Sequence, residues 1–263
     1  MFKTSYHKDV ICCQDEVTLL WSSLPVSFFL VDGLLVDTGP HALAAKSTVF
    51  FKAHEIDQIV LTHVHEDHCG MAGWLQKNKQ VPVYIHRDAV AAASRKSTLP
   101  LYRLRIWGER LPFRAQAMPE EIVTPNHRFQ PIDTPGHCAN HVVFYEKDKG
   151  WLFTGDVFIK IKQHLAFRGE NLAQMIESLK KLLELDFDTI FCAHSGILSC
   201  GYRLMEKKLA FLLDLQCQVQ ALEAQGLTPR QIDKKLFPVK HPMSNLSEGE
   251  GTSYNMVKTL GQV

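Results

Sequence analysis

The sequence lacks any long apolar run. A transmembrane helix needs roughly 20 consecutive apolar residues, and no such stretch occurs, although 46% of the 263 residues are hydrophobic. The first residues, Met1–Asp9, are too polar to form the apolar part of a secretory signal. The net charge is only +1 at pH 7, so there is no overall electrostatic reason to bind nucleic acid or a membrane. These absences predict a soluble, cytoplasmic protein.

A disulfide framework and a zinc finger are not indicated either. The chain has seven cysteines, which is an odd number, and they do not show zinc-finger spacing. This pattern is typical of reduced thiols. The apolar fraction is ample for one large domain with a further helical region.

Histidine and aspartate are instead concentrated in one short segment. Residues 62–70 read Thr-His-Val-His-Glu-Asp-His-Cys-Gly, so His63, His65, Asp67 and His68 fall within six positions. Neutral imidazole and carboxylate are ligands that zinc and similar divalent metals prefer. The first two histidines are two residues apart, which places them on one side of a strand or an extended loop. The segment therefore predicts a metal site.

The position of this segment supports the same prediction. The preceding residues 55–61 read as a buried strand, so the histidines follow the carboxyl end of a strand. In open α/β sheets, ligand sites are built at that end.

This cluster resembles the H-x-H-x-D-H signature of the metallo-β-lactamase superfamily. Three later segments are similar to the further motifs of that family, in the family's order, and each follows a strand-like run. They are Thr134–His137, Thr154–Asp156 and Ala193–Gly196. The resemblance covers about residues 15–200 and implies a four-layer αββα sandwich.

The resemblance also implies two divalent metal ions, with zinc expected first and iron or manganese as alternatives. It assigns the first ion to His63, His65 and His137, and the second ion to Asp67, His68 and His194. Asp156 would bridge both ions together with a water or hydroxide. Two ions roughly 3.5–4 Å apart can generate a nucleophile near neutral pH, so no serine or cysteine nucleophile is required.

Other residues near these motifs have expected roles. Asp67 is expected to serve catalysis as well as metal binding. His141, four residues after His137, either contacts substrate or transfers protons, or else supports a ligand. Each ligand histidine should donate its second N–H to an acceptor behind it, for which Asp37 and backbone carbonyls are candidates. Glu66 is expected to point away from the metals.

The rest of the chain predicts alternating strands and helices. We expect a hairpin over 26–37 with its turn at Asp32-Gly33, and a second hairpin from 142–145 to 151–154. Helices are predicted over 41–53, 71–78, from Leu172 onward, and over 202–225. Thr228-Pro-Arg-Gln231 reads as a capping box that opens a short helix. We divide the chain into a catalytic domain, 1–200, and a C-terminal helical region, 201–263.

Residues 87–126 form an insertion between the two halves. Cationic side chains alternate with apolar ones in it, and they are Arg95, Lys96, Arg103, Arg105, Arg110 and Arg114. The segment is either a solvated surface element or a lid over the metals. In the second case Arg103 and Arg105 would bind an anionic substrate.

The fold alone does not determine the substrate. The favoured hypothesis is hydrolysis of a small ester, thioester or lactone, as in the glyoxalase II branch of the family. The alternatives are a phosphodiesterase or endoribonuclease acting on single-stranded RNA, a mononuclear iron persulfide dioxygenase, and a non-catalytic effector-binding protein. His65 argues against the diiron flavoprotein branch, which carries a carboxylate at that position. The sequence leaves the oligomeric state open.

Overall fold

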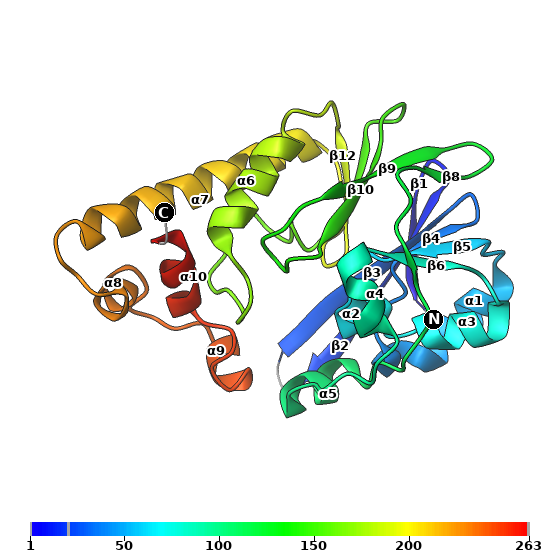
Figure 1. Ribbon diagram of the computed structural model, residues 1–263, viewed down its shortest axis with the longest axis horizontal. Coiled ribbons are helices and arrows are strands. Elements are labelled where there is room, and N and C mark those ends of the chain that lie inside the picture. Colours follow the sequence, from blue (N-terminus) through cyan, green and yellow to red (C-terminus); the bar gives the residue numbers. More distant parts are fainter. Residues whose placement is uncertain (1, 20–21, 262–263) are drawn as a thin grey trace.

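Two sheets stacked face to face form the centre of the molecule in this computed structural model, which describes residues 2–19 and 22–261 (Figure 1). The first sheet has the strand order β1-β2-β3-β4-β5-β6-β7 and the second has the order β13-β12-β11-β10-β9-β8. The strands of the first sheet are Lys3–His7, Val10–Leu19, Ser22–Val31, Leu34–Val36, Gln58–Val60, Val83–Ile85 and Gln116–Ala117. Those of the second, β8 to β13, are Ile122–Val123, Arg128–Asp133, Val142–Glu146, Trp151–Gly155, Thr189–Cys192 and Gly196–Leu198.

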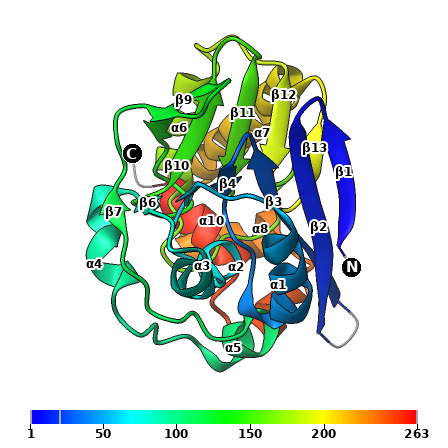
Figure 2. The same cartoon turned by 90° about the vertical axis from the view of Figure 1, so that its right-hand side faces the viewer.

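Helices cover the outer face of each sheet (Figure 2). On the first sheet lie α1 (Ala44–Ala53) and α3 (Ala72–Lys79), and on the second lie α6 (Leu172–Leu182) and α7 (Gly201–Glu223). The other described helices are α2 (Glu66–Cys69), α4 (Val90–Ala93), α5 (Leu101–Trp107), α8 (Pro229–Leu236), α9 (Met243–Leu246) and α10 (Ser253–Leu260), with 3-10 turns at His41–Leu43 and Arg87–Ala89. The expected four-layer αββα sandwich is confirmed.

Layers of buried side chains hold the sheets and the helices that cover them together. The core between the sheets is rich in aromatic rings, among them Phe29, Phe153 and Phe191. Phe153 and Phe191 stack with ring centres 4.4 Å apart. A second core fills the space between the first sheet and α1 and α3, and a third lies between the second sheet and α6, α7 and α10. Because the two sheets pack through apolar faces, the polar motifs are left at the strand ends.

Most predicted elements are confirmed, with boundaries that shift by a few residues. The hairpin between β3 and β4 turns at Asp32-Gly33, and both residues have the positive φ that this turn requires. The capping box at Thr228 is present, with reciprocal bonds to Gln231. Strands β1 and β2 lie outside the predicted elements. Most of β1 is exposed, so its sequence has no apolar alternation that would mark it.

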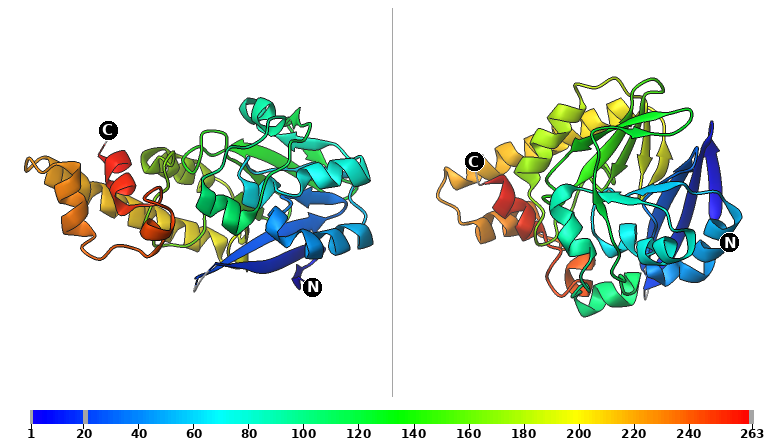
Figure 3. Two further views of the ribbon diagram at one scale, coloured as in Figure 1. Left: turned by 90° about the horizontal axis from the view of Figure 1, so that it is seen from below. Right: turned by 45° about the vertical axis from the view of Figure 1, so that its right-hand side comes forward.

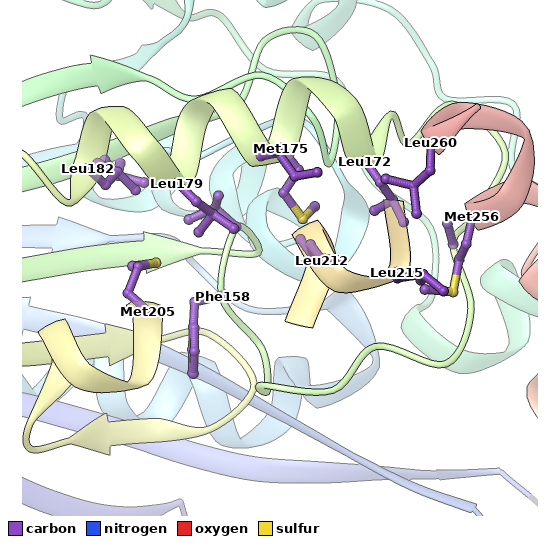
Figure 4. Close-up of a cluster of buried hydrophobic side chains, with 14 of the residues drawn as sticks. Phe158, Leu172, Met175, Leu179, Leu182, Met205, Leu212, Leu215, Met256 and Leu260 are labelled. Carbon is purple, nitrogen blue, oxygen red and sulfur yellow. The ribbon is translucent and has the colours of Figure 1, made fainter. Parts of the chain in front are cut away.

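The C-terminal helices share a core with the second sheet. On α7 the buried residues recur at helical spacing and include Met205, Leu212 and Leu215. They face Leu172, Met175 and Leu179 of α6, and α10 closes the same core (Figure 4). The division of the chain at residue 200 stays a prediction, because this core is continuous across it. Figure 3 shows α8, α9 and α10 at one end of the molecule. Among the described residues, no helix combines the length and apolarity needed to cross a membrane.

One lysine occupies a core position of α7. Lys208 is 2% exposed and its ammonium lies 5.8 Å from the ring centre of Phe158. Burial lowers the pKa of Lys208 from 10.5 to about 8, although the nearby Glu170 opposes this. The charged form is therefore disfavoured in the folded protein.

Replacing Lys208 by methionine should stabilise the protein. The gap between the two pKa values corresponds to roughly 3 kcal/mol, so we expect a gain of roughly 1–3 kcal/mol in the free energy of unfolding at pH 7. The gain should be complete below pH 8 and disappear by pH 10.5, where the unfolded chain also loses the proton. Denaturant unfolding of both proteins across this range measures it. A less stable Lys208→Met variant at pH 7 would contradict the prediction.

Candidate active site

The histidine-rich segment follows the carboxyl end of β5, as expected, and we call residues 62–70 the metal loop. The chain is extended at His65, with φ −68° and ψ 148°, and then turns into the short helix α2. The extended part turns His63 and His65 to one side, and the helical turn brings Asp67 and His68 beside them. Gly70 closes the turn against the backbone of Pro40 and His41, because a Cβ there would lie 2.6 Å from the His41 nitrogen.

All seven predicted ligands meet in two groups. The first group consists of His63, His65 and His137, and the second of Asp67, His68, Asp156 and His194. In the first group, His65 Nδ1 lies 2.9 Å from His63 Nε2 and 3.0 Å from His137 Nε2. Three ring nitrogens from two distant segments therefore converge on one point.

The second group is arranged around Asp156. Its Oδ1 lies 3.3 Å from His68 Nε2 and 3.2 Å from His194 Nε2. Its Oδ2 lies 3.5 Å from His137 Nε2 of the first group. Asp67 Oδ2 lies 3.5 Å from His194 Nε2. Asp156 thus faces both groups, which is the position that the resemblance implies for a bridging carboxylate.

The residues present fit a metal pair. Asp67 Oδ1, His68 Nε2 and Asp156 Oδ1 are buried and have no hydrogen-bond partner among the residues that the structure describes. Buried polar atoms are normally paired, and orphaned ones need an explanation. Here the orphaned atoms belong to imidazole and carboxylate groups that point at one another, so coordination of divalent ions accounts for them.

The pKa shifts of the histidines also favour metal binding. Burial, reinforced by the neighbouring histidines, lowers the pKa of His63 and His65 well below the usual value, which leaves their lone pairs free. Burial also acts on His68 and His194, but the carboxylates of Asp156 and Asp67 outweigh it and raise the pKa of both imidazoles. A metal ion that binds at the second group would therefore displace protons from these two histidines.

Acceptors behind the ligands set the orientation of the rings. His68 Nδ1 donates to Asp37 Oδ2 at 2.8 Å, and Asp37 also accepts from the Thr62 amide at 2.8 Å. His194 Nδ1 donates to the Pro25 carbonyl at 2.7 Å. The predicted supporting role of Asp37 is confirmed. Such partners fix the ring and the tautomer that a metal requires.

Glu170 is a supporting residue that the sequence did not reveal. Its Oε1 accepts from His137 Nδ1 at 2.8 Å, and its Oε2 accepts from Gln163 and from the Phe167 amide. The side chain is 8% exposed. No motif marks it, because the loop that carries it is 33 residues away from His137 in the chain. The one signal in the sequence is that Glu170 directly precedes Asn171, the N-cap of α6.

Of the two roles expected for His141, its hydrogen bonds favour support of a ligand. His141 is fully buried, its Nε2 accepts from the Asp156 amide at 3.0 Å, and its Nδ1 pairs with Thr134 Oγ1 at 2.8 Å. Burial lowers the pKa of His141 to about 3. Both ring nitrogens are used within the protein, so neither is free for substrate or for proton transfer. His141 instead supports the backbone at the bridging aspartate.

Two cations of the insertion, which was expected to be either a solvated surface element or a lid, are bonded within the protein. Arg103 on α5 does not stand free, because its Nη2 donates to Glu66 Oε2 at 2.9 Å and its Nε donates to Glu66 Oε1. Arg110 is 4% exposed and donates to the carbonyls of Ala92, Ala93 and Arg95, at the end of α4. Arg105 is exposed on α5. Two of the predicted lid cations therefore hold the insertion in place, and Trp107 of α5 lies near His194 with ring centres 6.3 Å apart.

Comparison with known proteins places these features in a family. The model of the "Metallo-beta-lactamase superfamily" matches residues 23–194. The chain is 34% identical over 185 residues to the "Hydroxyacylglutathione hydrolase" of Shewanella baltica, which covers 68% of this chain and 61% of that protein. It is 29% identical over 150 residues to the protein of the same name from Bdellovibrio bacteriovorus, at 55% and 52% coverage. The matches thus span about half to three fifths of these curated relatives.

Solved structures give the same fold at lower identity. A "Beta-lactamase domain protein" from Burkholderia ambifaria superposes with a TM-score of 0.76 at 17% identity, covering 98% of this chain and 86% of that one. A "metallo-beta-lactamase family protein" from Thermus thermophilus gives 0.66 at 20% identity, covering 94% and 91%. The family match includes every proposed ligand from His63 to His194, and the chain belongs to the metallo-beta-lactamase superfamily.

Proposed function

We propose that this protein is a metal-dependent hydrolase that uses a pair of divalent ions to cleave a small thioester, with esters and lactones as related substrates. One observation carries the proposal: two complete ligand groups share a central carboxylate, Asp156, that faces both. Zinc is the metal we propose first, because imidazole and carboxylate ligands suit it, although iron and manganese also accept this donor set.

Each part of the site has a proposed task. His63, His65 and His137 would hold one ion, Asp67, His68 and His194 the other, and Asp156 both. Bound ions of this kind polarise a carbonyl group and activate water at neutral pH. Asp37, Glu170 and the Pro25 carbonyl keep the imidazoles aligned. Arg105, exposed on α5, remains our candidate for contact with an anionic part of the substrate.

The choice of a thioester rests on the relatives. Several curated relatives are called hydroxyacylglutathione hydrolases, and the Shewanella protein is 34% identical over the aligned part. This name describes hydrolysis of an acyl thioester of glutathione, which is a small anionic molecule. The free cysteines are compatible with the reducing, cytoplasmic environment in which we place the protein.

A substrate panel tests the proposal. The full chain, loaded in separate samples with zinc, iron or manganese, is offered a hydroxyacyl glutathione thioester, an aryl ester, a lactone and bis(p-nitrophenyl) phosphate. We expect release of free thiol from the thioester with the highest kcat/KM of the four substrates. Faster cleavage of the phosphodiester would favour the nuclease alternative instead. Oxygen uptake by the iron-loaded protein with a persulfide would favour the dioxygenase.

A further inference from the structure

An ion pair between Arg103 and the buried Glu66 joins the insertion to the metal loop. Glu66 stands between the proposed ligands His65 and Asp67, and its side chain is 2% exposed. Arg103 approaches it with two parallel donors, from Nε to Oε1 and from Nη2 to Oε2. A guanidinium that pairs with a carboxylate through two bonds fixes both groups in distance and in orientation.

Helix α5 is itself fastened at two other points. Tyr102, next to Arg103, donates its hydroxyl to Glu250 Oε2 at 2.8 Å, which ties α5 to the C-terminal region. Gly108, at the end of α5, packs against the segment before α1, because a Cβ there would lie 3.0 Å from the Ala42 nitrogen. These two contacts hold α5 in place, and Arg103 of α5 therefore approaches Glu66 from a fixed position.

The charge of Glu66 matters to its neighbours. Its carboxylate is almost fully buried, and the guanidinium of Arg103 donates to both of its oxygens, so the ion pair compensates the buried charge. An uncompensated buried carboxylate beside Asp67 would repel it and would draw water or a proton into the loop. A shift of the loop at Glu66 would move His65 and Asp67, one ligand from each proposed metal position.

We propose that Arg103 is a positioning residue for the metal site: through its ion pair with Glu66 it holds the metal loop in the geometry that binds both ions. It acts through Glu66 and does not contact the substrate. This inference rests on the metal site of the proposed function. It replaces the hypothesis that Arg103 is part of an anion-binding lid.

A double-mutant cycle on the full chain separates the two roles. The variants are Arg103→Met, Glu66→Leu and the combination of both, with zinc affinity measured by competition with a chromogenic chelator and stoichiometry by elemental analysis. We expect Arg103→Met to weaken binding of the weaker zinc ion by about 10- to 100-fold, the range seen when a partner that orients a ligand is removed. The combined variant should recover most of this affinity, because it leaves no buried charge unpaired.

Two further variants provide controls. Arg103→Lys keeps the charge but cannot form the paired bonds, so its zinc affinity should lie between those of the wild type and Arg103→Met. Arg128→Ala removes an arginine from an exposed pair with Glu121, at 2.8 Å, and should leave zinc affinity unchanged. Hydrogen exchange of residues 62–70 should be faster in Arg103→Met and close to that of the wild type in the combined variant.

Zinc affinity and KM together distinguish a positioning role of Arg103 from a substrate-binding role. At saturating zinc, the KM of Arg103→Met for an anionic thioester should stay within about two-fold of the wild type. Unchanged zinc affinity with a raised KM, in both Arg103→Met and the combined variant, would overturn the inference and restore the substrate-binding role. A wild-type chain that binds none of zinc, iron and manganese would instead contradict the proposed function.

Discussion

Replacing Asp156 by alanine is expected to abolish binding of both metal ions and to lower kcat/KM by roughly 1,000-fold or more. Its two oxygens face His68 and His194 on one side and His137 on the other, so no other residue can take its place. Stabilisation of developing charge by bound metals contributes several kcal/mol to such reactions, and about 4 kcal/mol corresponds to 1,000-fold in rate.

A second ligand variant distinguishes the two positions. Asp67 belongs only to the second group, so Asp67→Ala should lower the metal content from about two equivalents to about one. Elemental analysis after dialysis, together with thioester hydrolysis rates, measures both variants. Full metal content in Asp156→Ala, or two equivalents in Asp67→Ala, would rule out the assignment of the ligands.

Gly155→Ala is expected to destabilise the protein strongly, although it adds only one methyl group. Gly155 has φ +47°, and a Cβ there would lie 2.6 Å from His141 Nε2 and 2.8 Å from the Thr62 Cβ. His141 and Thr62 are both buried, so neither can move away easily. The left-handed backbone and the overpacking together should cost roughly 2–5 kcal/mol. That loss corresponds to a fall in Tm of roughly 5–15 °C.

The matched control is Gly226→Ala. Gly226 also has a left-handed φ, +83°, but nothing lies within 4 Å of its added Cβ. The Gly226→Ala variant should therefore be destabilised only by the backbone strain, which costs about 1–2 kcal/mol in the free energy of unfolding. Thermal unfolding of both variants, with metal content measured in parallel, tests the difference. Equal losses in the two variants would mean that the contacts of the added methyl group with His141 and Thr62 carry no weight.

The surroundings of Gly155 explain why the Thr154-Gly-Asp156 motif could be identified from the sequence but not understood from it. The motif is local, and its aspartate was correctly predicted to join the cluster. The need for glycine arises from His141 and Thr62, which approach it from other segments of the chain. A pattern of neighbouring residues carries no information on such distant contacts.

The same distinction between local signals and distant contacts applies to the helices and to the arginines of the insertion. The amphipathic spacing of α6 and the capping box of α8 were predicted correctly, because both depend on residues within one or two turns. The insertion was harder to interpret. The alternation of arginines with apolar side chains does not reveal that Arg103 meets Glu66, 37 residues earlier, or that Arg110 caps the end of α4.

The sequence by itself determined the candidate ligand set, the order of the motifs and the layered αββα architecture. They followed from the resemblance of four short motifs to the metallo-β-lactamase superfamily, and each motif consists of residues that are close together in the chain. The tertiary structure decided what surrounds the ligands: Glu170 behind His137, the buried position of His141, and the ion pair between Glu66 and Arg103. These roles depend on which segments the packing of two sheets brings together, and on the burial that then makes an unpaired charge costly.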